Sequence, residues 1–336
     1  MPLDVAGLGN ALMDALVIIE DDGLLDEFQL SRGTMHPVDD QDWARLFERA
    51  QASAKVTFDS GGSCANTIAT VGRLGGQALY CGQVGDDAFG DLYAKHLNAH
   101  CGRHSLRIAE GLPTGKCLSL ISRRDAERTM ATDLGASIQL PDLGAFSEEL
   151  VQAQIAHFTG YTLLSEPMRG LTLGAIEKAS SAGTRISLDV ADPFVVEAIR
   201  PVLNALVDTD VQVLFLNAEE AQSLTGCPPE EALAQLVGRG RLETIVVKLG
   251  QRGSRVWHQG QTFDVPVFKV EPIDTTGAGD AYAGGFLYGL SRGWSAERCG
   301  ALATRVAGLT VGQLGAVVKD HEAMMDALKA VQPSGA

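Results

Sequence analysis

The sequence predicts an α/β protein in which helices cover both faces of a central, mostly parallel sheet, with a second, small β-sheet beside it. Three observations favour this fold class. Short apolar runs alternate with helical patterns through most of the chain, which is typical of a parallel sheet between two helical layers. Two stretches, residues 14–38 and 105–132, have β-like, partly alternating patterns instead. A chain of 336 residues, 45% of them hydrophobic, can form one large domain and a smaller addition.

The elements of the main sheet are predicted in chain order. The N-terminal part contains a strand at residues 3–8, a helix at 64–74, a strand at 78–84 and a helix at 87–100. The alternation resumes with strands at 155–158, 185–190, 211–216 and 244–248, separated by helices at 167–181, 194–207 and 229–238. A tight turn at 250–253 leads to a strand at 254–258, and helices beginning at Ala278 and Ala296 precede a last one near 322–331.

The two exceptional stretches are predicted to form one small sheet. Their clearest strands lie at residues 16–19 and 116–121, and their similar character favours pairing although they are far apart in sequence. We therefore expect two domains: a core of residues 1–13, 39–104 and 133–336, and a small β domain of residues 14–38 and 105–132.

Composition limits the class of partner. The net charge of −15 argues against nucleic acid or an anionic membrane as the main partner, although local glycine loops and a few arginines could still hold a negatively charged substrate. The six cysteines have neither C-x-x-C nor zinc spacing and are expected to be reduced. The N-terminus lacks a basic signal-like region, and no apolar run is long enough to span a bilayer, which predicts a cytoplasmic protein.

The motif D-T-T-G-A-G-D at residues 274–280, followed by A-Y-A-G-G-F, predicts an anion site at a helix N-terminus. The backbone N–H groups of Gly277, Ala278 and Gly279 and the positive end of the helix dipole would bind phosphate there. A carboxylate beside a phosphate suits proton abstraction from an attacking hydroxyl, which makes Asp280 the candidate base. The alternative is structural, with close packing at the glycines and Asp280 as a favourable charge in the first turn.

This motif resembles the C-terminal signature D-T-x-G-A-G-D of the PfkB, or ribokinase-like, family of sugar and nucleoside kinases. A second signature, G-G-S-C-A-N-T at residues 61–67, and G-Q-V-G-D-D-A-F-G at residues 82–90 are similar to family motifs in the expected order. The resemblance implies a three-layer α/β/α sandwich in which the small sheet is a lid over the carboxyl ends of the main strands. It also implies transfer of the γ-phosphoryl group of ATP to a hydroxymethyl group, with Mg²⁺ bridging the phosphates.

The same resemblance assigns acceptor-binding residues. Gly61 and Gly62 let the backbone approach substrate hydroxyls, and Asn66 would present a donor and an acceptor to a diol. The resemblance places Asn10 and Asp14 at the end of the first strand. Arg128, in D-A-E-R-T-M, would steady the phosphate when the lid closes, the alternative being a solvated turn arginine.

Further residues are implied for nucleotide and metal. Asn217 and Glu220, in N-A-E-E after a core strand, would orient Mg²⁺ through water, with helix capping as an equal alternative. The other implied nucleotide-binding residues are Thr275, Lys248, Gly250, Gly253 and Gly315, although the family often has threonine where Lys248 stands. Asp274 and carbonyl groups near Gly315 would hold a monovalent cation such as K⁺.

The acceptor is left open between nucleosides and sugars. The run G-L-G-N-A-L-M-D at residues 7–14 is similar to the opening of adenosine kinases, and Leu12, Met130 and Leu134 are expected to line an apolar slot for a base. This favours the adenosine-kinase-like branch. Ribokinase, fructokinase and 2-keto-3-deoxygluconate kinase types are the alternatives, and a non-catalytic nucleotide or sugar sensor is an alternative of another class. A monomer and a homodimer are both compatible with the sequence.

Overall fold

The structure, a computed structural model, describes residues 3–332. Its main sheet has nine strands in the order β14-β13-β12-β11-β10-β9-β1-β5-β6. Neighbours from β6 to β12 pair in parallel, whereas β13 and β14 pair antiparallel at one edge. The bounds are β1 Val5–Leu8, β5 Ala78–Gly85, β6 His104–Ala109, β9 Ile155–Thr159, β10 Arg185–Asp189, β11 Val211–Asn217, β12 Thr244–Lys248, β13 Ser254–His258 and β14 Gln261–Val265.

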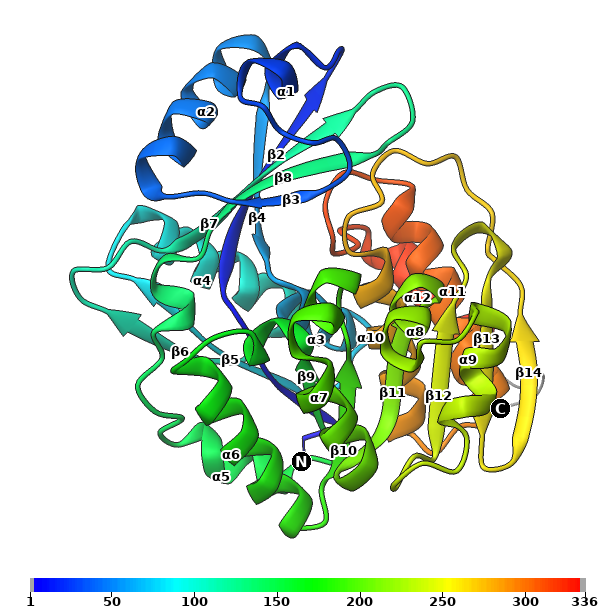
Figure 1. Ribbon diagram of the computed structural model, residues 1–336. Helices are drawn as coiled ribbons and strands as arrows, with labels where there is room; N and C mark the ends of the chain where they lie inside the picture. The colour runs from blue at the N-terminus through cyan, green and yellow to red at the C-terminus, as the bar shows by residue number, and fades with distance from the viewer. Residues whose placement is uncertain (1–2, 333–336) are drawn as a thin grey trace.

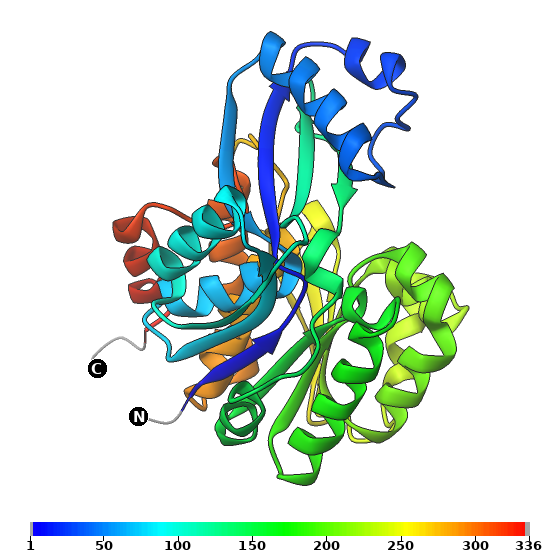
Figure 2. The same cartoon turned by 90° about the vertical axis from the view of Figure 1, so that its left-hand side faces the viewer.

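Helices cover both faces of this sheet, which confirms the predicted three-layer fold (Figures 1 and 2). One layer contains α5 Phe146–Gln152, α6 Met168–Ser181, α7 Pro193–Thr209, α8 Ala218–Thr225 and α9 Pro229–Leu236. The other contains α3 Ser63–Arg73, α4 Ala88–Cys101, α10 Ala278–Ser291, α11 Ala296–Val311 and α12 His321–Lys329. Within residues 3–332 no helix is long and apolar enough to cross a membrane.

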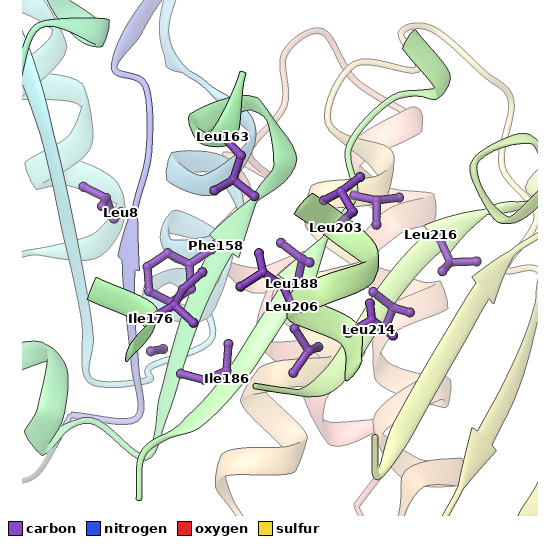
Figure 3. Packing of buried hydrophobic residues seen from close by; sticks show 14 of the residues in the cluster. Leu8, Phe158, Leu163, Ile176, Ile186, Leu188, Leu203, Leu206, Leu214 and Leu216 are labelled. Atoms are coloured by element: carbon purple, nitrogen blue, oxygen red, sulfur yellow. The ribbon is translucent and has the colours of Figure 1, made fainter. Parts of the chain in front are cut away.

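The central strands are apolar on both sides because each side chain meets a helical layer. Phe158, Leu188 and Leu214 lie in the cluster under α5–α9 (Figure 3). On the opposite face, Phe215 of β11 packs edge-on against Phe286 of α10, with ring centroids 5.8 Å apart. Continuous burial of strand residues therefore fixes the sheet in the middle of the molecule, and the buried polar side chains of His157 and Ser187 inside it are joined by a 3.0 Å hydrogen bond.

The small sheet has the strand order β3-β8-β7-β2-β4 and stands above the main sheet (Figures 1 and 2). Its strands are β2 Leu12–Ile19, β3 Met35–Pro37, β4 Val56–Gly61, β7 Gly115–Ser122 and β8 Arg128–Asp133. Helices α1 (Gly23–Glu27) and α2 (Asp40–Ser53) cover one face through Leu25, Trp43 and Leu46. The other face carries a row of paired positions that includes Asp59, Asp14, Cys117 and Thr132.

The strand assignments differ from the predicted boundaries in two places. Helix α2 and strand β4 lie within residues 39–104, which were predicted for the core, yet β4 pairs antiparallel with β2 of the small sheet. Conversely, β6 lies almost wholly within residues 105–132, which were predicted for the small domain, yet it pairs with β5 at the edge of the main sheet. These assignments were wrong because strand pairing is a long-range choice that local alternation does not encode.

Candidate active site

Asp280 lies in the first turn of α10, at the carboxyl edge of the main sheet. Gly277 is the residue before the helix and has φ +71°, a conformation that disfavours side chains. The N–H groups of Gly277, Gly279 and Asp280 donate to no protein acceptor within residues 3–332, whereas that of Ala278 donates to Thr275 O at 3.3 Å. Three bare donors at the positive end of a helix dipole make this turn suitable for an anion.

The carboxylate of Asp280 is held by helix α3. Ser63 Oγ donates to Asp280 Oδ1 at 2.7 Å, and Asn66 Nδ2 donates to Oδ2 at 2.9 Å. Close packing of the two helices makes these contacts possible, because a Cβ at Gly284 would lie 2.7 Å from the carbonyl oxygen of Thr67. Sequence reasoning missed Ser63, although its spacing of three residues from Asn66 on a helix was a usable signal.

Burial raises the pKa of Asp280, while the hydrogen bonds from Asn66 and Ser63 lower it and the Asp189 carboxylate raises it. The net shift is upward. A carboxylate with a raised pKa is a stronger base, and this one remains partly exposed at the helix terminus.

The predicted acceptor residues Asn10, Asp14, Gly61 and Gly62 converge. Asn10 lies in the turn between β1 and β2, whereas Asp14 is inside β2 and not at the end of the first strand as predicted. A Cβ at Gly61 would overlap the Asp14 carboxylate, and one at Gly62, where φ is +95°, would overlap the Asn10 carbonyl. The two glycines therefore bring the start of α3 against these polar residues.

Two buried acceptors at this point lack hydrogen-bond partners within residues 3–332: Asn10 Oδ1 and Asn66 Oδ1. Burial raises the pKa of Asp14 to about 8, with Arg128 lowering it and Asp59, Asp274 and Asp280 raising it. Buried acceptors without donors are costly, so the arrangement suits a ligand that supplies hydroxyl groups.

Arg128 begins β8 and faces this acidic region. Burial raises the pKa values of Asp14 and Asp192, and the positive charge of Arg128 opposes the rise at both carboxyl groups. Tyr161 and Phe194 form a tilted aromatic pair on the core side, with centroids 6.3 Å apart, and burial raises the pKa of Tyr161 although Arg128 opposes the rise. The two rings come from separate segments, Tyr161 from the short 3₁₀ helix after β9 and Phe194 from the start of α7.

The nucleotide side contains a buried ion pair and a capping box. Lys248 Nζ donates to Asp189 Oδ2 at 2.7 Å, and Asp189 was not among the predicted site residues. Asn217 N and Nδ2 each donate to Glu220 at 2.6 Å, and Glu220 N donates to Asn217 Oδ1 at 2.8 Å. The capping alternative therefore describes the local geometry of α8.

Glu220 is buried, and burial raises its pKa to about 7 although Lys248 lowers it. No cluster of three or more His, Cys, Asp or Glu side chains in the described residues could hold a metal ion. Asn217 and Glu220 therefore do not form a metal site whose ligands all come from the protein. Their geometry is compatible with contacts to Mg²⁺ through water.

The remaining predicted residues divide between the anion turn and a neighbouring turn. Asp274 accepts from Thr276 N at 2.8 Å, from Thr276 Oγ1 at 2.5 Å and from Gly315 N at 2.9 Å, so Gly315 is tied to the anion turn. Thr275 Oγ1 donates to Ala126 O at 3.4 Å, which joins this turn to the small sheet. Gly250 and Gly253 form the turn from β12 to β13, where Gly253 packs against the Val265 carbonyl.

Comparison with known proteins identifies the family. The profile of the pfkB family of carbohydrate kinases matches residues 34–323. The chain belongs to this family. Within it, fructokinase-1 of Oryza sativa subsp. japonica is 30% identical over 239 residues, which cover 68% of this chain and 72% of that protein.

Two solved structures of similar proteins cover nearly the whole chain. A probable sugar kinase protein from Rhizobium etli CFN 42 has a TM-score of 0.91 at 29% identity and covers 98% of this chain and 99% of its own. Adenosine kinase from Sinorhizobium meliloti has a TM-score of 0.89 at 30% identity, with coverage of 98% and 100%. This pfkB protein is therefore a sugar or nucleoside kinase, a phosphotransferase with an alcohol group as acceptor, and the family implies ATP and usually Mg²⁺.

Proposed function

We propose that this pfkB kinase transfers the γ-phosphoryl group of ATP to the hydroxymethyl group of an adenosine-like nucleoside, with Asp280 as the general base. The observation that carries the proposal is the position of the Asp280 carboxylate, held by Ser63 and Asn66 at a helix N-terminus whose N–H groups are bare. A base and an anion site within one helical turn are what phosphoryl transfer to a hydroxyl requires.

In this mechanism the bond between the γ-phosphorus and the ADP oxygen breaks as the bond to the acceptor oxygen forms. Asp280 takes the hydroxyl proton, while Ser63 and Asn66 fix the direction of its oxygens. The N–H groups of Gly277 and Gly279 hold the negative charge of the transferring group. Because the transition state of phosphoryl transfer is loose, positioning and charge stabilisation supply most of the acceleration.

The residues present fit ATP and Mg²⁺, but they fit a monovalent cation less well. Bare N–H groups at α10 suit the phosphates, and Asn217 with Glu220 would hold Mg²⁺ through water, the ion neutralising the phosphate charge. The predicted K⁺ site uses the Asp274 carboxylate, whose oxygens already accept three hydrogen bonds from Thr276 and Gly315. Dependence on K⁺ stays a prediction.

Two features support the nucleoside assignment: hydrogen-bond acceptors for the ribose and an aromatic surface for the nucleobase. Asn10 Oδ1, Asn66 Oδ1 and the protonatable Asp14 match the hydroxyl groups of a ribose. The half-exposed ring of Phe194, beside Tyr161, offers a purine the stacking surface that a free sugar does not need. Met130 shares a face of β8 with Arg128 and adds an apolar contact.

A sugar kinase is the second candidate, favoured by the similarity to a plant fructokinase and to the probable sugar kinase of Rhizobium etli. The residues that contact a ribose diol would also bind a free sugar. A non-catalytic sensor is not proposed, because Asp280 and both glycines of the anion turn are present.

The test measures kcat/KM for adenosine, ribose, fructose and fructose 6-phosphate at the same ATP and Mg²⁺ concentrations. We expect adenosine to be the best acceptor and Asp280→Asn to lower kcat by about 10²–10⁴-fold with unchanged affinity for an ATP analogue. Asp91→Asn is the matched control, since Asp91 is an exposed aspartate in the first turn of α4.

The outcomes separate the candidates. Efficient sugar phosphorylation without adenosine turnover would overturn the nucleoside assignment and leave the kinase mechanism intact. A folded Asp280→Asn protein with nearly wild-type kcat would show that Asp280 is not the base. Binding of ATP without phosphorylation of any acceptor would favour a sensor.

A further inference from the structure

Lys248 is the last residue of β12, and its side chain reaches the N-terminus of α10. A Cβ built on Gly279 would lie 3.2 Å from Lys248 Nζ. Gly279 is the second residue of the helix, and its N–H is one of the bare donors of the anion turn. The ammonium group therefore lies beside the proposed phosphate position rather than elsewhere along the sheet edge.

A lysine at this position is electrostatically unusual. The positive end of a helix dipole disfavours a cation, and the Lys248 side chain is only 16% exposed to water. The 4% exposed carboxylate of Asp189, 2.7 Å away, offsets this cost on one side. Burial lowers the pKa of Lys248, but the charges of Asp189 and Glu220 raise it by more, so the group stays protonated.

The ammonium group of Lys248 has more N–H donors than acceptors in the described residues. It carries three N–H bonds, and within residues 3–332 it makes one hydrogen bond, to Asp189. The charge of Lys248 lowers the pKa of Asp280, and the charge of Asp280 raises the pKa of Lys248. The cation and the proposed base therefore lie within electrostatic reach of each other. Two sources of positive charge, the helix N-terminus and the ammonium group, thus flank the point where the phosphoryl group would pass.

We infer that Lys248 is a further catalytic residue, whose ammonium group, held in place by Asp189, donates to the transferring phosphoryl group beside the N–H of Gly279. This inference rests on the proposed kinase activity and deepens it. Asp189 is a positioning residue, since it acts through Lys248. The competing explanation is an ion pair that only stabilises the fold, and it predicts a change in melting temperature without a specific loss of transition-state affinity.

The experiment compares Lys248→Met, Lys248→Arg and Asp189→Asn with wild type in the full chain. The matched control is Lys95→Met, which removes an exposed cation of α4 that the proposed site does not include. For each protein we would measure kcat and KM with adenosine, or with the best acceptor of the panel above. We would also measure the dissociation constants of Mg·ADP alone and of Mg·ADP with aluminium fluoride and acceptor, which mimics the transferring group.

We expect Lys248→Met to lower kcat by about 10²-fold, in the range seen when one charge-stabilising donor is lost. The affinity for the aluminium fluoride complex should fall by a similar factor, while the affinity for Mg·ADP and the acceptor KM change by less than about threefold. Lys248→Arg should recover part of the loss because it restores a cation, and Asp189→Asn should give an intermediate loss. Lys95→Met should match wild type.

Lys248→Met leaves Asp189 unpaired and could fail to fold for that reason. In that case the double variant Lys248→Met/Asp189→Asn, which removes both charges, takes the place of the single variant in the experiment. A folded Lys248→Met or double variant with nearly wild-type kcat would overturn the inference. Equal losses of affinity for Mg·ADP and for the aluminium fluoride complex would also overturn it, because the lysine would then bind the ground state. Wild-type protein that phosphorylates no acceptor would instead refute the proposed function.

Discussion

Gly277 and Gly279 flank one alanine in the anion turn, but their backbone conformations differ. Gly277 has φ +71°, and a Cβ there would overlap Ala316. Gly279 lies in the regular helix, and a Cβ there would meet only the flexible end of Lys248, at 3.2 Å. The sequence motif treats the two glycines alike, so the distinction comes from the fold.

We predict that Gly277→Ala is the more damaging substitution. The left-handed conformation costs a residue with a side chain about 1–2 kcal/mol, and the overlap with Ala316 would shift the turn that holds the bare N–H groups. Gly277→Ala should lower both the melting temperature and kcat, whereas Gly279→Ala should keep the melting temperature and lose less activity. Thermal unfolding and steady-state kinetics on both variants check this. Equal effects on both measurements would contradict the assigned difference.

At the scale of the element, strand β2 contains a buried ionisable residue, Asp14. Asp14 is 8% exposed, and burial raises its pKa from the ordinary 3.8 to about 8, against the opposing effect of Arg128. Between these two values the folded protein binds a proton that the unfolded chain has released. Stability contributed by this group is therefore complete below about pH 4 and is lost as the pH rises toward 8.

We predict that Asp14→Asn removes this pH dependence. The melting temperature of the variant relative to wild type should be higher at pH 8 than at pH 5, because asparagine cannot ionise and avoids the cost of a buried charge. Asp26→Asn, at an exposed carboxylate of α1 in the same domain, is the control and should show no such change. The same melting-temperature difference at both pH values would refute the assignment of a raised pKa to Asp14.

At the scale of the whole molecule, Asp59 of β4 connects the small sheet to the core. Its carboxylate lies 3.1 Å from Lys319 Nζ and 3.2 Å from His100 Nε2, and His96 Nδ1 is 3.3 Å away. Lys319 follows the segment that contains Gly315, whose N–H binds Asp274 of the anion turn. The small sheet, helix α4 and the anion turn therefore meet around one buried carboxylate.

We predict that Asp59 and Lys319 are energetically coupled. A double-mutant cycle of Asp59→Asn and Lys319→Met, measured by denaturant unfolding, should give a coupling free energy of about 0.5–1 kcal/mol. The value stays small because the Lys319 side chain is half exposed, and because His96 and His100 still face Asp59 when Lys319 is replaced. A coupling energy of zero would show that the contact does not help to hold the small sheet on the core.

Much of the architecture was predictable from local pattern. The apolar strands between residues 155 and 248 were expected at nearly the positions found, because burial on both faces leaves continuous apolar runs. The helices between them were expected as well, except α8 at Ala218–Thr225. The kinase family and the enzyme class were predicted from the D-T-T-G-A-G-D motif and are confirmed. The motif also placed Asp280 and Gly277 at a helix start, since caps are encoded within a few residues.

Only the tertiary structure decided which distant segments meet. It moved β4 to the small sheet and β6 to the main sheet, because strand pairing depends on partners far along the chain. It also showed that Ser63 and Asn66 hold the carboxylate of Asp280, although both lie more than 200 positions before it in the sequence. In the same way, Asp189 holds Lys248. The sequence by itself determined the chemical groups and their local conformation, whereas the site depends on contacts between segments that local propensity does not specify.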